Sequence, residues 1–161
     1  MVIKMKAIET ALSLTQAYKL GIERFEKMLG EEFSKAIELM SKTNEHIIIC
    51  GMGKSGLVGR KISSTLASTG TPSIFLHPAE AIHGDLGKVQ KKSIVLLISY
   101  SGETEEIIAL IPAFKRLNVT IVALTGVKDS TLASKADIIL DTSVDREACP
   151  LNLAPTTSTM I

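Results

Sequence analysis

The stretch SIVLLISYSGETEEI, residues 93–107, joins an unbroken apolar run to a polar loop that contains a glycine. The run SIVLLI at 93–98 predicts a strand buried on both faces, as strands of parallel sheets are. Residues 103–117 predict a helix that is kinked at Pro112. Its inward-facing positions are Ile107, Ile108, Leu110, Ile111, Phe114 and Leu117. A buried strand that leads through a loop into an amphipathic helix is the repeating unit of α/β proteins.

The same alternation extends in both directions along the chain. Further strands are predicted at HIIIC (46–50), SIFL (73–76), VTIVALT (119–125) and DIIL (137–140). Helices are predicted at 5–29, 32–41, 58–69 and 130–135. This order predicts an α/β fold with a doubly wound, five-stranded parallel sheet between two helical layers, as in flavodoxin-like proteins. We expect one domain over 1–161, with leading helices in 1–43 and the α/β core in 44–161.

The composition limits the classes of partner. A hydrophobic fraction of 45% and a charged fraction of 22% are typical of soluble globular proteins. The formal net charge is +1 and the chain has no basic run, which gives no support for a nucleic-acid or membrane-surface partner. No signal-peptide h-region or membrane-length apolar run is present. The two cysteines, Cys50 and Cys149, predict neither a disulfide framework nor a zinc site, so we expect a cytoplasmic protein.

The loop GMGKSG (51–56) follows the first predicted strand and opens a helix. It matches the pattern of dinucleotide-binding loops, but that class also needs an acidic residue at the end of the second strand, where this chain has His77 and Pro78. A P-loop is excluded because it would require glycine in place of Ile48. We favour a loop whose glycines let the backbone approach an anion while Lys54 adds positive charge, without a cofactor. The alternative is a tight turn with a solvated lysine.

Three hydroxyl groups, those of Ser99, Ser101 and Thr104, surround Gly102 at the start of the predicted 103–117 helix. A phosphate dianion carries several acceptor oxygens. Clustered hydroxyls, backbone N–H groups and the positive end of a helix dipole supply donors for them without a metal. The alternative is an ordinary helix cap, for which one hydroxyl is enough. The loop SYSGET therefore predicts a phosphate-binding site.

Five segments of the sequence occur in a characteristic order. They are GMGKSG (51–56), STGTP (68–72), HPAEAIHGDLG (77–87), SYSGETEEI (99–107) and EACPLNLAPTTST (147–159). Together they resemble the sugar isomerase (SIS) domain of arabinose-5-phosphate isomerases. The resemblance implies an SIS-type fold and interconversion of D-arabinose 5-phosphate and D-ribulose 5-phosphate, on the route to the lipopolysaccharide sugar Kdo. It also implies a homo-oligomer, a dimer or tetramer, with sites shared between subunits.

The resemblance implies roles for individual residues as well. The implied catalytic residues are Lys54, Glu106, Glu147 and His83. The implied substrate and phosphate contacts are Gly70, Thr71, Ser99, Ser101 and Thr104, and the two loops add Gly53, Ser55 and Gly102. His77 matches a residue that is associated with zinc in relatives, although this chain offers no second ligand at a recognisable spacing.

These residue types suit aldose–ketose isomerisation. A proton leaves C2 and returns to C1 through an enediolate, so one carboxylate serves as base and then as acid. We expect Glu147 to be that base and Glu106 to orient Lys54, which would stabilise the developing oxyanion. His83 could move hydroxyl protons or help to open the sugar ring. Without the family, Glu106 is an ordinary acid at a helix N-terminus.

Members of the family continue into a long helix and then a further catalytic histidine, and full-length relatives carry paired CBS domains. This sequence contains neither that histidine nor those domains. We therefore expect an incomplete last helix, in a fragment or a truncated protein. Two alternatives stay open beside the proposed isomerase. One is a sugar-phosphate-binding module without catalysis, and the other is an SIS isomerase for another sugar phosphate.

Overall fold

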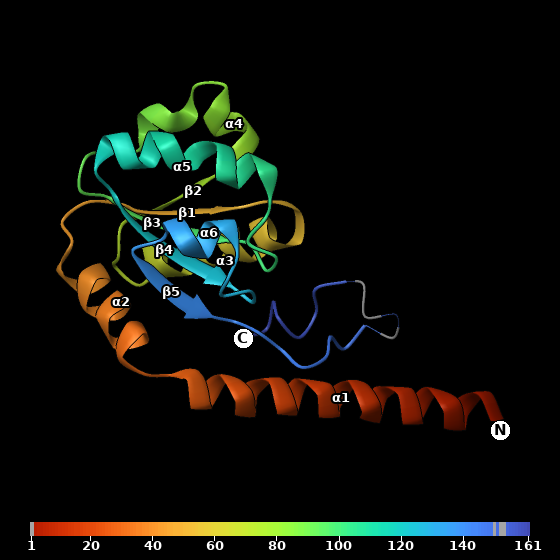
Figure 1. Cartoon of the computed structure of the whole chain (residues 1–161). Coiled ribbons are helices and arrows are strands. Elements are labelled where there is room, and N and C mark those ends of the chain that lie inside the picture. The colour runs from red at the N-terminus through yellow and green to blue at the C-terminus, as the bar shows by residue number, and fades with distance from the viewer. Residues whose placement is uncertain (1, 150, 152–153) are drawn as a thin grey trace.

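Five parallel strands form the centre of the computed structural model, which describes residues 2–149, 151 and 154–161, with side chains from residue 6 on (Figure 1). The strands are β1 (Ile47–Gly51), β2 (Ser73–Leu76), β3 (Ile94–Ile98), β4 (Thr120–Thr125) and β5 (Ile138–Asp141). They lie in the order β2-β1-β3-β4-β5, and every neighbouring pair is parallel. The predicted five-stranded parallel sheet is confirmed.

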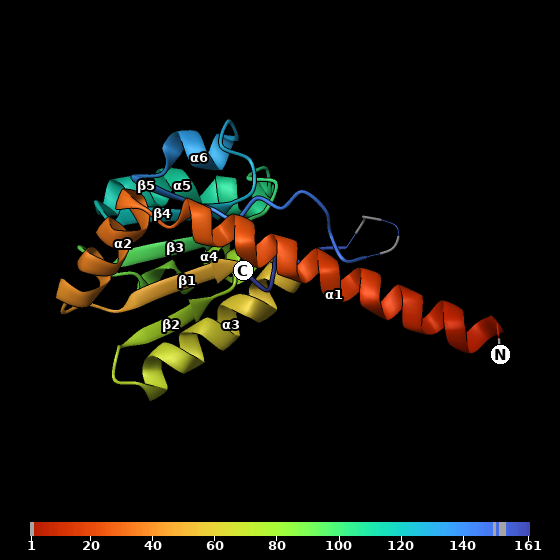
Figure 2. The same ribbon diagram turned by 90° about the horizontal axis from the view of Figure 1, so that it is seen from below.

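Helices cover both faces of the sheet (Figures 1 and 2). One face packs against α2 (Glu31–Lys42) and α3 (Gly53–Ser68), which contribute Ala36 and Ile62 to its core. The other packs against α4 (Pro78–Ile82), α5 (Glu105–Leu117) and α6 (Thr131–Lys135), with Phe114 and Leu132 fully buried. The strands are apolar on both faces because both faces are covered.

Several elements differ from the sequence prediction; helix α3, for example, begins at Gly53 and not at residue 58. The segment after β2 forms the short helix α4 and a 3₁₀ turn, η1 (Asp85–Lys88), which have too few residues to show a helical period. Helix α5 begins at Glu105, two residues later than predicted, and continues through Pro112 as one helix to Leu117. The described residues 154–161 form bends and turns without a regular helix.

The order of the strands reverses beside β1. The chain moves from β1 outward to β2 and then crosses to β3 on the other side of β1. The register pairs Gly51 with Ile98, so the loops that follow β1 and β3 begin next to each other at the carboxyl edge. Such a switch point is where open α/β sheets bind ligands.

Helix α1 (Val2–Met28) projects from the body of the molecule (Figures 1 and 2). It packs on the chain through its small residues Ala17 and Gly21. A Cβ on Gly21 would lie 2.5 Å from Thr157 Cγ2. The large apolar side chains Ile8 and Leu12 are instead 62% and 65% exposed. In the part of the chain that the structure describes, none of the helices has both the length and the hydropathy that crossing a membrane requires.

Candidate functional site

A cavity of about 310 Å³ opens between the loops that follow β1 and β3. Ser55 lines it from the first turn of α3, and the SYSGET loop contributes Ser99, Ser101 and Thr104. The sequence favoured an anion near the first loop and predicted a phosphate site at the second, and the structure places residues of both loops on one cavity. Other lining residues are Met52, Ile98, Tyr100, Glu147, Ala154 and Pro155.

The three hydroxyls of the SYSGET loop, residues 99–104, are organised by the loop itself. Ser99 Oγ lies 2.7 Å from Thr104 Oγ1 and accepts a hydrogen bond from the Gly102 N–H at 3.1 Å. Ser101 Oγ accepts from the Glu103 N–H at 3.2 Å. Gly102 has φ +66°, a left-handed conformation that other residues adopt with strain. This conformation folds the loop back on itself at the N-terminus of α5.

The geometry argues against an ordinary helix cap. Thr104 is the N-cap residue of α5, yet its side chain makes no capping hydrogen bond. Its hydroxyl pairs with Ser99 instead. The Ile107 and Ile108 N–H groups both donate to the Thr104 carbonyl at 3.0 Å. The two N–H groups before them, at Glu105 and Glu106, have no carbonyl partner among the described residues, and the helix dipole adds positive potential there. Three hydroxyls that line one cavity beside a helix N-terminus fit an anion site.

The Glu147 carboxylate binds the C-terminal segment, which forms one wall of the cavity. Its Oε2 accepts hydrogen bonds from the backbone N–H groups of Thr156, Thr157 and Ser158 at 2.7, 2.6 and 3.3 Å, and from Thr156 Oγ1 at 3.0 Å. Its Oε1 accepts from Ser158 Oγ. The side chain is 8% exposed. This carboxylate therefore ties residues 156–158 to the cavity, directly after its lining residue Pro155.

These contacts change the acidity of Glu147. Burial raises the pKa of its carboxyl, but hydrogen bonds from Ser158 and Thr156 lower it by more, so the pKa lies below the ordinary value of 4.5. A carboxylate with a lowered pKa and several bound donors is a weak proton acceptor. The expectation that Glu147 is the catalytic base finds no support in this geometry.

Glu147 should make stability dependent on pH. Because its pKa is depressed in the folded chain, its stabilising contribution is complete above pH 4.5 and is lost as the pH falls through the folded value. We expect Glu147→Gln to lower the free energy of unfolding at pH 7 by about 1–3 kcal/mol, and to flatten its dependence on acid pH. Urea unfolding between pH 3 and 7 measures both effects. The control is Glu26→Gln at an exposed acid, and equal curves for the two variants would contradict the assignment.

The remaining predicted catalytic residues, Lys54, Glu106 and His83, are not among the residues that line the cavity. Gly53 and Lys54 begin α3, and Lys54 is exposed. Glu106 is half-buried in the first turn of α5. Among the described residues, neither Lys54 nor Glu106 forms an ion pair, so the expected orientation of Lys54 by Glu106 is not seen as a contact. His83 is exposed at the C-cap of α4.

Gly70 and Thr71 lie elsewhere in this subunit. They connect the end of α3 to the start of β2, so they are at the amino edge of the sheet, opposite to the SYSGET loop. The structure does not bring them to the cavity within one chain. His77 follows β2, and its Nδ1 is buried without a hydrogen-bond partner among the described residues. Within the same part of the chain, no three His, Cys, Asp or Glu side chains come together as a metal site.

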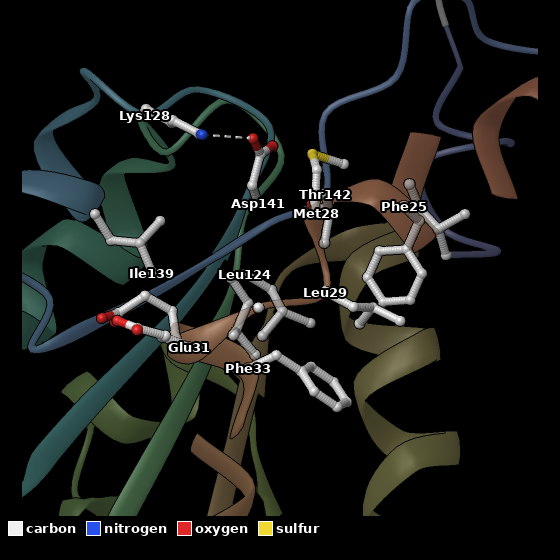
Figure 3. A pocket seen from close by; sticks show the side chains of 14 residues that line it. Phe25, Met28, Leu29, Glu31, Phe33, Leu124, Lys128, Ile139, Asp141 and Thr142 are labelled. Atoms are coloured by element: carbon white, nitrogen blue, oxygen red, sulfur yellow. Dashed lines mark ion pairs between the residues drawn. The ribbon is translucent and has the colours of Figure 1, made fainter. Parts of the chain in front are cut away.

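A wider and more apolar cavity of about 470 Å³ lies between the α1–α2 connection and β5 (Figure 3). Its wall includes Phe25, Leu29 and Ile139. Its lysine, Lys128, is paired with Asp141 at 3.0 Å. An anionic, hydroxyl-rich ligand finds few partners on such a wall. The smaller polar cavity at the switch point is therefore the better candidate for the functional site.

Sequence reasoning missed three residues that shape the site. Tyr100 lies inside the SYSGET loop, but an aromatic residue between two serines gives no signal of its own. Its hydroxyl accepts a hydrogen bond from the Val144 backbone N–H at 3.4 Å. Ala154 and Pro155 lie in the segment 147–159, where the sequence indicated no role for them, and the structure places them in the wall of the cavity.

Comparisons with known proteins agree with this geometry. Residues 39–161 match the family model described as SIS domain. The chain is 54% identical over 133 residues to arabinose 5-phosphate isomerase KdsD of Pseudomonas aeruginosa, a match covering 83% of this chain and 41% of that protein. It is 52% identical over 142 residues to arabinose 5-phosphate isomerase KpsF of Escherichia coli O6:H1, covering 88% of this chain and 43% of that protein. The chain thus spans less than half the length of these curated relatives.

Solved structures show the same fold. The c3406 protein of E. coli CFT073, solved in complex with arabinose 5-phosphate, superposes with a TM-score of 0.86 at 36% identity. The match covers 97% of this chain and 83% of that one.

Proposed function

The chain belongs to the SIS domain family, and from that premise we propose that it is a sugar-phosphate isomerase that interconverts D-arabinose 5-phosphate and D-ribulose 5-phosphate. The observation that carries the proposal is the convergence of the hydroxyls of Ser99, Ser101 and Thr104 at the switch point of the sheet. The relatives named arabinose 5-phosphate isomerase, and the relative solved with arabinose 5-phosphate, support the choice of substrate.

In the proposed reaction the SYSGET loop holds the phosphate group. Its hydroxyls and the first amides of α5 supply donors, so the phosphate anchors the sugar in a fixed orientation. Lys54, on the facing loop, would stabilise the negative oxygen of the enediolate. His83 would move hydroxyl protons during ring opening. The proposal assigns no metal to His77, since the described residues around it do not form a ligand cluster.

We assign the proton transfer between C2 and C1 to Glu106 rather than Glu147. Glu147 is engaged with the donors of residues 156–158, and its pKa is lowered. Glu106 has no hydrogen bond or ion pair from its side chain among the described residues and lies two positions after Thr104. Its carboxylate is therefore available to accept a proton and return it, as the role of base and then acid requires. Under this assignment Glu106→Gln abolishes turnover while leaving phosphate binding intact.

A second candidate is a module that binds a sugar phosphate without converting it, because Lys54, Glu106 and His83 do not line the cavity in this subunit. One experiment separates the two. The 161-residue chain is incubated with arabinose 5-phosphate, and ribulose 5-phosphate is measured alongside thermal shifts with arabinose 5-phosphate, inorganic phosphate and NAD. The isomerase gives turnover and protection by the first two compounds. Protection without turnover identifies the binding module, and protection by NAD alone would refute both.

We also propose that the protein works as a homo-oligomer in the reducing cytoplasm. The support is the exposed apolar side of α1, with Ile8, Leu12 and Ile22, together with the free buried thiol of Cys50. Large exposed apolar side chains along one helix are typical of association surfaces. We expect Leu12→Glu to shift the mass measured by light scattering toward the monomer. Ser64→Glu, which adds the same charge on the exposed surface of α3, should leave the mass unchanged, and a wild-type monomer would refute the proposal.

A further inference from the structure

Glu103 is an acidic residue inside a loop that the proposed function assigns to an anion. A negative charge there opposes phosphate binding. The structure gives this side chain a specific contact: its Oε1 accepts a hydrogen bond from the backbone N–H of Thr131 at 2.7 Å. Thr131 is the first residue of α6, so its N–H has no partner within that helix. The carboxylate of one loop therefore caps the helix that follows another strand.

Further contacts join the SYSGET loop to the connection between β4 and α6. The Leu132 N–H donates to the Gly102 carbonyl at 3.0 Å, and the Gly126 N–H donates to the Tyr100 carbonyl at 2.9 Å. Gly102 lies so close to Ser130 that a Cβ at position 102 would be 2.0 Å from Ser130 Oγ. The residues of these backbone contacts are buried or half-buried, whereas Glu103 and its partner Thr131 are both exposed.

We propose that Glu103 is a positioning residue for the SYSGET loop, and that its hydrogen bond to Thr131 fixes the loop in the conformation that binds the phosphate group. The proposal rests on the proposed function, because that function assigns phosphate to this loop. It explains why an anion-binding loop carries an acid: the bond that orders the loop outweighs the repulsion that the exposed charge exerts on the ligand.

The proposal is tested by whether removing the Glu103 side chain weakens or strengthens phosphate binding. If Glu103 acts only through its charge, Glu103→Ala strengthens phosphate binding. If it positions the loop, the same change weakens binding. We expect Glu103→Ala to raise the Kd for inorganic phosphate and the KM for arabinose 5-phosphate about tenfold, with kcat changed by less than about threefold. Glu103→Gln keeps an oxygen acceptor and should stay within about twofold of wild type.

Two further variants complete the design. Glu105→Ala removes an exposed charge two residues away whose side chain forms no hydrogen bond or ion pair in the described chain, and binding should be unchanged or tighter. Thr131→Pro removes the donor and keeps Glu103. Proline is tolerated at the first position of a helix, and Ser130 before it is extended, with φ −75° and ψ 162°. This variant should match Glu103→Ala, and the double variant should add nothing further.

The outcomes are distinguishable. Tighter phosphate binding by Glu103→Ala, or additive effects of Glu103→Ala and Thr131→Pro, would overturn the positioning role. Failure of the wild-type chain to bind phosphate would instead refute the proposed function. Should Glu103→Ala not fold, Thr131→Pro and Glu103→Gln still test the same hydrogen bond.

Discussion

Replacement of Lys54 by methionine is expected to lower kcat about 10²- to 10³-fold. Methionine keeps an unbranched apolar stem of similar length, so the change removes the positive charge and little packing. The charge matters most when the enediolate oxygen becomes negative, because a preorganised cation stabilises the transition state more than the ground state. Initial rates of ribulose 5-phosphate formation, with KM determined separately, measure the effect.

The matched control for Lys54 is Lys61→Met on the same helix. Lys61 is also exposed and forms no ion pair among the described residues, so both kcat and KM should stay near wild type. A Lys54→Met variant with unchanged kcat and a raised KM would assign Lys54 to substrate binding rather than to the enediolate.

The second large effect is expected at Gly102. Alanine there must adopt φ +66°, and its Cβ would lie 2.0 Å from Ser130 Oγ, 2.4 Å from Ser130 Cβ and 3.1 Å from Thr125 Oγ1. Backbone strain and buried overlap both act against the native loop, so we expect Gly102→Ala to lower the free energy of unfolding by about 2–4 kcal/mol. Phosphate binding should be lost as well. Urea unfolding and phosphate thermal shifts measure the two effects.

Two comparisons separate the overlap from the backbone strain. Gly84 has φ +134°, but a Cβ there meets nothing within 4 Å, so Gly84→Ala should cost only the strain, about 1–2 kcal/mol. In the double variant Gly102→Ala/Ser130→Gly, the overlapping side chain is removed, and glycine remains an acceptable N-cap for α6. We expect it to recover part of the lost stability. No recovery would show that strain alone limits Gly102.

The sheet could be predicted from the sequence because its strands are short apolar runs between turn-forming residues. The runs IIIC and IVLLI each lie within a strand whose positions are buried or nearly so. Helix α5 was predictable for a related reason: Ile107, Leu110 and Phe114 recur at helical spacing and are buried. Local periodicity reports which side of an element is apolar.

The spacing of apolar residues along a helix does not show whether its apolar side packs inside the subunit or faces solvent. In the first predicted helix the apolar residues Ile8 and Leu12 are exposed in this chain, whereas the helix packs through Ala17 and Gly21. Small residues that permit close approach carry no hydropathy signal. A stripe that faces solvent within one subunit can be interpreted only when the rest of the assembly is known.

The site could be predicted where its chemistry is local in sequence. The hydroxyls of residues 99–104 lie on one loop, so their convergence was visible in the motif. Glu103 and Glu147 could not be assigned in the same way, because their partners are backbone N–H groups at 131 and at 156–158. Every residue except proline carries a backbone N–H, so the sequence does not show which of these groups a given carboxylate binds. Only the fold does.

The contact between Glu147 and residues 156–158 has a consequence for synthesis. A ribosome delivers the chain from its N-terminus at about 5–20 residues per second, so all five strands emerge before Thr156 does. From the end of β5 at Asp141 to Ser158, translation takes roughly one to three seconds at that speed. During that interval the SYSGET loop is complete, while the wall that Glu147 fastens is not yet present. Under the proposed function, a nascent chain therefore completes the loop that would bind phosphate before it completes the cavity wall that could distinguish one sugar from another.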